Sequence, residues 1–142
     1  MRQPNMKPCH HVAIAIVHRN GRWLVALRRP EAHLGGLWEF PGGKLHDGES
    51  ATDAALRELR EECAVEADVE RVLPPVEHDY GDRLVRLTAV LCRWRSGEPR
   101  PLSGEVCRWV TRGELAELAM PALNAEIIAA ATGEAQPRTG CD

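Results

Sequence analysis

The sequence predicts one α/β domain in which a mixed β-sheet carries helices on both faces. The chain has 142 residues, a length that suggests a single domain with a substantial hydrophobic core. Short apolar runs suited to strands recur along the chain, and helical patterns lie between and after them. No internal repeat, low-complexity tract or linker separates these segments. Helices interspersed with strands in this way favour packing on both faces of one sheet.

The composition indicates a globular protein of a reducing compartment. The chain is 44% hydrophobic with a formal net charge of −3, so no basic excess indicates a nucleic-acid partner. The five cysteines are scattered and include no CxxC pair, which favours structural thiols over a disulfide framework or a zinc site. We expect a cytoplasmic protein without a membrane partner, because the sequence has no signal-peptide pattern and no apolar run of transmembrane length.

The segment before the main helix is expected to supply three strands. Apolar residues 12–17 suit a buried strand, and Asn20-Gly21 then gives the strongest short hairpin signal. A second strand is expected at 23–27 on the other side of this turn. Extended chain returns at 37–40, after a loop that contains two glycines.

The segment after the main helix is expected to alternate strands with two more helices. Its strand candidates are residues 69–73, 76–80, 84–94 and 106–110. Thr111 with Glu114 forms a capping-box pattern that opens a helix ending at about residue 120. A final helix is expected at 121–131. Both ends of the chain are expected to be loose tails, at residues 1–8 and 133–142.

The main helix is predicted from Ser50 to Cys63. Ser50 with Asp53 three residues later is a capping-box pattern, and no Gly or Pro interrupts the good helix formers that follow. One stripe of this helix is apolar and consists of Ala55, Leu56, Leu59 and Cys63. Another is acidic and consists of Glu58, Glu61 and Glu62, whose carboxylates repel one another at this spacing.

An acidic helix stripe of this kind has two interpretations. A charge run on a helix is usually a solvated face. The alternative is a site for a hard divalent cation, because Mg²⁺ prefers carboxylate oxygens and bridges to substrate phosphates. The Gly42-Gly43 pair in the loop before the helix favours the cation site, since such a pair lets backbone approach a metal or ligand closely.

The segment from Gly43 to Val65 is similar to the Nudix box, the loop-helix signature of the Nudix hydrolases. That signature runs Gly, five residues, Glu, seven residues, Arg-Glu, an aliphatic residue, any residue, Glu-Glu, any residue, Gly and an aliphatic residue. The positions that match it are Gly43, Glu49, Arg57, Glu58, Leu59, Glu61, Glu62 and Val65. Ala64 stands where the family has the Gly that normally ends the helix in a left-handed turn. Ala is accommodated there at some cost if the turn is right-handed or extended instead.

The resemblance extends over residues 12–130 and implies the Nudix α/β/α sandwich. It implies Mg²⁺ as the cofactor, with Mn²⁺ as an alternative. The ligands that it implies are the carboxylates of Glu58, Glu61 and Glu62 and the carbonyl of Gly43. It also implies that Arg57 orients these catalytic glutamates, that Glu49 supports the loop, and that either Glu58 or Glu105 acts as the general base.

Within the superfamily, the chain looks most like the MutT branch, which sanitises nucleotide pools. The segments that carry this resemblance are Arg28-Arg29, residues 37–44 and residues 120–124. The resemblance implies that Arg29 lies near the nucleotide phosphates, Phe40 near the base, and that Asn124 reads an oxidised guanine. An amide suits that task because it offers a donor and an acceptor to a purine edge.

Three functions follow from the resemblance. The first is Mg²⁺-dependent attack of water on a nucleoside triphosphate such as 8-oxo-dGTP, giving a monophosphate and pyrophosphate. The second is hydrolysis of CTP-type or other nucleoside diphosphate derivatives, by a branch that tends to carry Asp where Asn124 stands. The third is nucleotide binding without catalysis, which the intact acidic set disfavours. The expected partner is a nucleoside triphosphate, and the expected state is a monomer or a homodimer.

Overall fold

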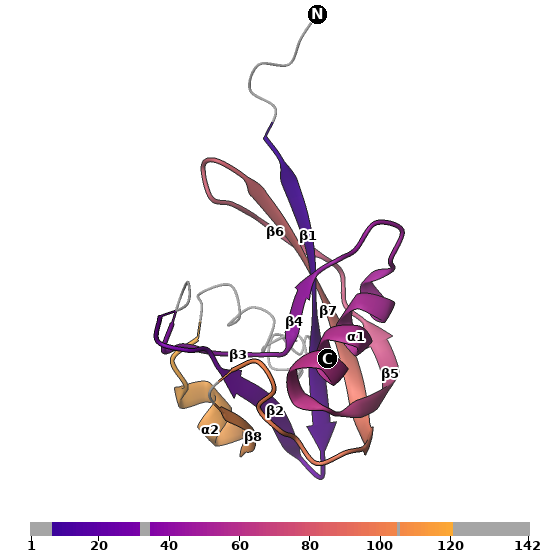
Figure 1. Cartoon of the computed structure of the whole chain (residues 1–142), viewed down its shortest axis with the longest axis vertical. Coiled ribbons are helices and arrows are strands. Elements are labelled where there is room, and N and C mark those ends of the chain that lie inside the picture. Colours follow the sequence, from indigo (N-terminus) through magenta and orange to yellow (C-terminus); the bar gives the residue numbers. More distant parts are fainter. Residues whose placement is uncertain (1–6, 32–34, 105, 121–142) are drawn as a thin grey trace, which may run out of the picture.

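Eight strands in the described part of the chain form one sheet, with a helix on each face (Figure 1). The structure is a computed structural model that describes residues 7–31, 35–104 and 106–120. The strands are β1 (Cys9–Arg19), β2 (Arg22–Leu27), β3 (Trp38–Glu39), β4 (Gly42–Lys44), β5 (Glu66–Val72), β6 (Val76–Asp79), β7 (Leu84–Ser96) and β8 (Val106–Thr111). The helices are α1 (Ala51–Cys63) and α2 (Arg112–Glu117).

Strand β1 forms the centre of the sheet. It runs parallel to β7 along most of its length, and the other strand pairs described are antiparallel, so the sheet is mixed. The strand order is β3-β2-β1-β7-β5, with β4 beside β1, β6 beside β7 and β8 beside β2. The predicted Asn20-Gly21 hairpin joins β1 to β2, and both residues have the positive φ, 51° and 77°, that a tight primed turn requires.

Alternate side chains of β1 point to opposite faces of the sheet and divide the core in two. On one face, small side chains of the sheet pack with α1; this cluster includes Ala13, Ala15, Val17, Ala55 and Leu59. On the other face, larger side chains pack with α2; this cluster includes Ile14, Ile16, Phe40 and Leu115. Each face therefore has its own helix, which confirms the predicted α/β sandwich.

The strands predicted from the sequence each have a counterpart in the sheet, but one strand was not predicted. The prediction of a loop at the glycine pair is wrong for Gly42–Lys44, which forms β4. These residues pair antiparallel with β1, where Ala13 lies opposite Gly43. The extended conformation comes from this long-range pairing. The sequence Gly-Gly-Lys has no alternation of apolar and polar side chains from which a strand could be predicted.

The two described helices differ in how well the sequence predicts their ends. Helix α1 begins and ends where the capping pattern and the box place it. Helix α2 stops at Glu117, earlier than expected, because Leu118 is already extended with φ −73° and ψ 144°. The expected final helix at 121–131 and both expected tails, except Lys7 and Pro8, lie outside the described residues. Neither described helix is long and apolar enough to cross a membrane.

Ala64 ends α1 in a left-handed turn, with φ 62° and ψ 34°. Ala64 is therefore accommodated in the left-handed turn itself, and not through a right-handed or extended turn, the alternative that would have suited Ala. The Ala64 N–H donates to the Arg60 carbonyl at 3.0 Å, which completes the last turn of the helix before the chain turns away. The helix therefore ends in the left-handed turn that is usual for the Nudix box, although this conformation is strained for Ala.

We expect Ala64→Gly to raise the free energy of unfolding by about 1 kcal/mol, because glycine adopts positive φ without the clash of a Cβ. Chemical denaturation of the two proteins measures this difference. The control is Ala116→Gly on the exposed side of α2, where glycine should instead cost about 1 kcal/mol or less. Equal destabilisation by both substitutions would contradict the strained turn.

Candidate active site

Helix α1 holds its acidic residues next to strand β4. The helix begins where the Ser50 hydroxyl accepts a hydrogen bond from the Asp53 N–H at 3.0 Å, and its apolar stripe packs on the sheet. Glu58 then lies directly against the backbone of β4. A Cβ placed on Gly43 would come within 2.7 Å of Glu58 Cδ. Glycine at this position therefore allows a closer approach of strand and carboxylate than any other residue would.

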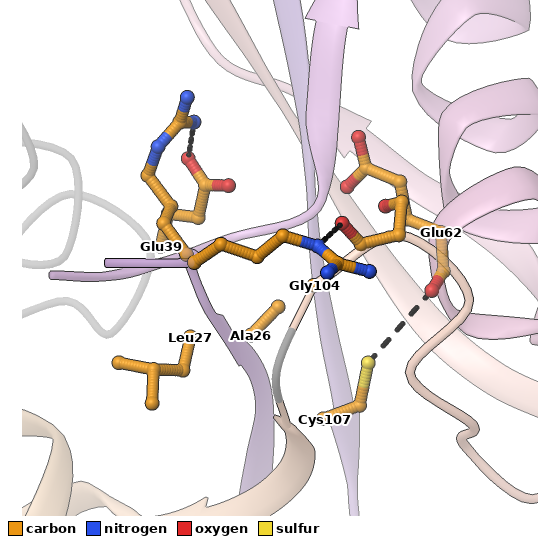
Figure 2. Close-up of a pocket in the computed structure, with 9 residues that line it drawn as sticks. Ala26, Leu27, Glu39, Glu62, Gly104 and Cys107 are labelled. Carbon is orange, nitrogen blue, oxygen red and sulfur yellow. Dashed lines mark hydrogen bonds and ion pairs between the residues drawn. The ribbon is translucent and has the colours of Figure 1, made fainter. Parts of the chain in front are cut away.

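A cavity of about 190 Å³ lies between this helix and the strands β2, β3 and β8 (Figure 2). Its polar and charged lining includes Arg28, Arg29, Glu39, Glu62, Ser103 and Cys107. These residues come from segments far apart in the sequence, which the pairing of β2 with β3 and β8 brings together. The cavity therefore joins the acidic helix to two arginines.

Glu62 is the residue of the acidic stripe that faces this cavity. Its Oε1 accepts a hydrogen bond from the Gly42 N–H at 3.3 Å. Burial is the main cause that raises the pKa of Glu62 to about 9, and hydrogen bonding and repulsion from the Glu58 carboxylate raise it further. Burial and the neighbouring Glu58 carboxylate therefore favour the protonated form of Glu62 when no cation is present to compensate its charge.

The two arginines of the cavity are anchored differently. Arg28 Nη1 donates to Glu39 Oε1 at 2.8 Å, an ion pair between the end of β2 and β3. Burial raises the pKa of Glu39, and the Arg28 guanidinium only partly opposes this effect. Arg29 Nε donates to the Ser103 carbonyl at a long 3.5 Å. Arg29 is thus the more weakly held of the two hydrogen-bonded guanidinium groups.

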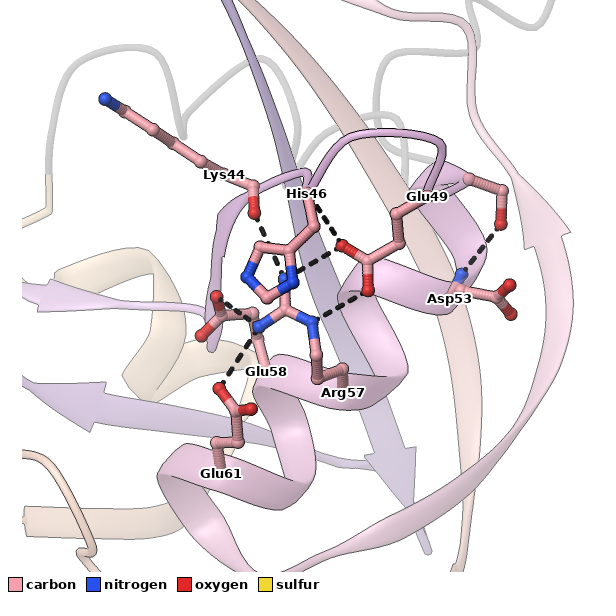
Figure 3. Close-up of polar contacts among 8 residues, drawn as sticks. Lys44, His46, Glu49, Asp53, Arg57, Glu58 and Glu61 are labelled. Carbon is pink, nitrogen blue, oxygen red and sulfur yellow. Dashed lines mark hydrogen bonds and ion pairs between the residues drawn. The ribbon is translucent and has the colours of Figure 1, made fainter.

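Arg57 connects the acidic helix to the loop before it (Figure 3). Its Nε and Nη2 donate to the two carboxylate oxygens of Glu49 at 2.7 and 3.0 Å, and Nη2 also donates to the Lys44 carbonyl at 3.1 Å. Its Nη1 donates to Glu58 Oε2 and to Glu61 Oε1, each at 3.1 Å. One guanidinium therefore holds three of the box carboxylates and the end of β4 in fixed relative positions.

Glu49 supports the loop between β4 and α1. Besides Arg57, its carboxylate accepts a hydrogen bond from the His46 N–H at 2.8 Å. The Arg57 guanidinium, followed by this backbone donor, lowers the pKa of Glu49 to about 2. Glu49 is therefore ionised throughout the physiological range, and its oxygens are engaged by the protein itself.

The carboxylates beside β4 are the kind of donors that a hard divalent cation requires. The Glu58 and Glu62 side chains are close enough to share a hydrogen bond, and their mutual repulsion is what a bound cation would relieve. Glu61 is 58% exposed and turned toward Arg57. Accordingly, no three His, Cys, Asp or Glu side chains within the described ranges are grouped as a complete metal site. The donor chemistry fits a cation, with Glu58 and Glu62 as its core.

The structure brings together four of the residues predicted for the cation site and its support, namely Gly43, Arg57, Glu58 and Glu62. Glu61 contacts the same arginine from the exposed side, and Arg29 lines the adjoining cavity. Phe40 is 2% exposed and packs in the core of the second sheet face. Its contact with a base, and the roles of all these residues, stay predictions. Glu105 and Asn124 lie outside the described residues.

Two further residues of the cavity, Glu39 and Cys107, are not among the site residues predicted from the sequence. The signal for Glu39 is weak, an acid within a short extended run that follows Trp38. Its place in the cavity depends on the pairing of Leu27 with Trp38, which brings it to Arg28. Cys107 carries no pattern at all, because a single cysteine within a strand is usually a packing residue.

The family model and the similar proteins of known function indicate the same family. The NUDIX domain matches residues 12–130 of the chain. The chain is 38% identical over 91 residues to the 8-oxo-dGTP diphosphatase of Proteus vulgaris, and this alignment covers 63% of the chain and 81% of that protein. It is 40% identical over 78 residues to the CTP pyrophosphohydrolase of Escherichia coli strain K12, which covers 55% of the chain and 58% of that protein.

Solved structures have the same fold. The solution structure of the E. coli ORF135 protein superposes with a TM-score of 0.79 at 26% identity, and covers 96% of both chains. The solution NMR structure of MutT from methicillin-resistant Staphylococcus aureus 252, of the Nudix hydrolase family, superposes with a TM-score of 0.74 at 30% identity. That match covers 91% of this chain and 99% of the other.

Proposed function

The chain belongs to the NUDIX domain family, and we propose that this hydrolase splits nucleoside triphosphates into a monophosphate and pyrophosphate with Mg²⁺. Oxidised purine nucleotides such as 8-oxo-dGTP are the proposed substrates. The observation that carries the proposal is the partly buried Glu62 beside Glu58, next to a cavity that also holds Arg28 and Arg29. Cation ligands and groups that attract phosphate thus adjoin one another, as hydrolysis of a phosphoanhydride requires.

Glu58, Glu61 and Glu62 with the Gly43 carbonyl would hold the cation, which supplies charge neutralisation for the phosphate oxygens when bound. Arg57 already orients Glu58 and Glu61 in the absence of a ligand, through its hydrogen bonds to both carboxylates. Glu62 would give its proton to solvent water when the cation binds, which makes both of its oxygens available as ligands. Mn²⁺ is expected to substitute, because it accepts the same oxygen ligands.

The remaining residues of the proposed mechanism bind the nucleotide and move a proton. Arg29, loosely held by the Ser103 carbonyl, is free to turn toward the phosphates. A carboxylate takes the proton of the attacking water, and Glu58 and Glu105 are the two candidates for this base. Water attacks the β-phosphorus, and the monophosphate leaves. The cytoplasm, where nucleoside triphosphates are kept, is the proposed location.

Hydrolysis of CTP is a second candidate function. It is favoured by the 40% identity to the E. coli CTP pyrophosphohydrolase, which is as high as the identity to the 8-oxo-dGTP diphosphatase of P. vulgaris. The smaller share of that relative's length in the alignment, 58% against 81%, makes it the weaker candidate. Both candidates use the same cation site and differ in the base that the enzyme selects.

A product assay over a panel of nucleotides separates the candidates. With Mg²⁺ present, we expect 8-oxo-dGTP to give the highest kcat/KM in a panel that also contains dGTP, CTP, dCTP and ADP-ribose. The highest value for CTP or dCTP would establish the second candidate. If no nucleotide of the panel is hydrolysed, the proposed triphosphate chemistry is wrong.

Asn124→Asp tests the proposed reading of the base. We expect this substitution to lower the preference for 8-oxo-dGTP over dGTP by about 10-fold or more, because an amide that both donates and accepts becomes an acceptor only. The kcat/KM ratio of the two substrates measures the preference. Since neither the cation site nor Arg57 is altered, hydrolysis itself should persist. An unchanged ratio would show that Asn124 does not take part in recognition of the base.

A further inference from the structure

Cys63 and Cys107 are thiols whose sulfur atoms lie 3.0 Å apart. Cys63 is the last residue of α1, directly after Glu62, and Cys107 lies in β8. A disulfide bond has an S–S length of about 2.05 Å, so the two sulfurs need to approach by only about 1 Å to be joined. The fold therefore holds the two sulfurs close enough for a small movement of the side chains to bring them to bonding distance.

We propose that Cys63 and Cys107 are an oxidation site, at which hydrogen peroxide converts the two thiols into an intramolecular disulfide. The two members differ in access. Cys107 is partly exposed and lines the cavity beside Glu62 (Figure 2). Cys63, in contrast, is 0% exposed in the core. A small oxidant that enters the cavity therefore reacts with Cys107 first. Cys63 lies behind Cys107 and is the resolving thiol, which attacks the oxidised sulfur to form the disulfide.

The chemistry balances with peroxide as the only co-reactant. The sulfur of Cys107 attacks one peroxide oxygen, the O–O bond breaks, and water leaves with the thiol proton, so that Cys107 becomes a sulfenic acid. The sulfur of Cys63 then attacks the Cys107 sulfur, the S–O bond breaks, and a second water leaves with the Cys63 proton. The two sulfurs lose two electrons in total, and the peroxide gains them.

The other described cysteines have no comparable partner. Cys92 is fully buried, and its thiol donates to the Val90 carbonyl at 3.5 Å. Cys9 is exposed at the start of β1. Within the described part of the chain, no sulfur contact joins either of them to another cysteine. Proximity thus selects Cys63 and Cys107 for coupling.

The disulfide would fasten the end of the acidic helix to the strand that lines the cavity. The two cysteines are separated by 44 positions in the sequence, and a cross-link over a loop of this length restricts the unfolded chain considerably. We therefore expect the oxidised protein to have a Tm higher by about 5–15 °C than the reduced protein. Amide hydrogen exchange in the last turn of α1 should slow as well.

Titration of the purified protein with hydrogen peroxide tests the proposal. The expected result is a loss of two hydrogens in the intact mass, a cross-linked peptide pair containing Cys63 and Cys107, and a Tm increase that dithiothreitol reverses. Cys107→Ser should abolish all three changes. Cys63→Ala, chosen because this residue is fully buried, should instead let Cys107 stop at its own oxidised forms. Cys9→Ser is the control that should behave like the unsubstituted protein.

Three outcomes would overturn the proposal. One is a disulfide that includes Cys9, Cys92 or Cys141 in place of either member of the pair. Another is oxidation of Cys107 to a sulfinic acid while Cys63 remains a thiol. The third is persistence of both thiols at peroxide concentrations that oxidise Cys9 in the same sample. None of these readouts depends on which nucleotide the enzyme hydrolyses, so the proposal stands or falls separately from the proposed function.

Discussion

Glu62→Gln is expected to lower kcat by about 10²–10⁴-fold and, at the same time, to raise the Tm of the cation-free protein. The loss of activity follows from the proposed role of Glu62 as a cation ligand, because an amide does not supply the charged oxygen that a carboxylate offers to a cation. The gain in stability follows because Gln is isosteric with Glu, while the substitution removes a carboxylate that burial and Glu58 make costly to ionise. Activity assays and thermal melts of the two proteins measure both effects.

The size of this stability gain should depend on pH. The pKa of Glu62 is about 9 in the folded protein, against an ordinary value of 4.5. Between these two values the unfolded chain binds fewer protons at this residue than the folded chain, so the stability of the unsubstituted protein falls as pH rises. Gln does not titrate. The Tm difference between Glu62→Gln and the unsubstituted protein should therefore widen from pH 5 to pH 9.

Glu61→Gln is the matched control for the pH series. It makes the same chemical change on the same helix, but the Glu61 side chain is 58% exposed. Its effect on Tm should be small, because both the carboxylate and the amide that replaces it are in contact with water. A Tm for Glu62→Gln below that of the unsubstituted protein, or a difference that does not vary with pH, would contradict the described environment of Glu62.

Gly43→Ala is expected to lower kcat/KM by about 10²-fold with little loss of stability, because the new methyl group would occupy the space of the Glu58 carboxylate. The Cβ would come within 2.7 Å of Glu58 Cδ, and the flexible end of the glutamate has to move away. That movement takes a proposed cation ligand, and a candidate base, out of position. Steady-state kinetics and chemical denaturation separate the two effects.

Gly42→Ala gives the opposite pattern and serves as the control. A Cβ at Gly42 would meet backbone, with Ile14 Cα at 2.8 Å, and backbone in the middle of the sheet cannot move aside. We expect its free energy of unfolding to fall by about 1–3 kcal/mol. Full activity of Gly43→Ala, or a larger stability loss than in Gly42→Ala, would contradict the close approach of Gly43 and Glu58.

The parts of the site that depend on local sequence could be predicted. Ser50 caps α1, no Gly or Pro follows it, and the spacing of Glu58, Glu61 and Glu62 fixes their place on one side of the helix. Residues three and four positions apart are neighbours on a helix, so the structure of such a segment can be predicted from its own sequence pattern. The Asn20-Gly21 turn is local in the same sense.

The parts that depend on long-range pairing could not be predicted. Gly42–Lys44 is a strand because β1 lies beside it, and Glu39 reaches the cavity because β3 pairs with β2. The sulfur contact of Cys63 with Cys107 likewise joins a helix end to a distant strand. The left-handed turn at Ala64 shows the same influence on a single residue, since its surroundings hold a conformation that Ala alone disfavours.

Hydrolysis of 8-oxo-dGTP in ¹⁸O-labelled water, followed by ³¹P NMR, tests the central claim most directly, namely that the α1 carboxylates support water attack on a triphosphate. With Mg²⁺ present, we expect a monophosphate and pyrophosphate as products. The label should be in the pyrophosphate, because water attacks the β-phosphorus in the proposed mechanism. Chelation of the cation should stop the reaction. Labelled orthophosphate, label in the monophosphate, or hydrolysis that continues without a divalent cation would contradict the account.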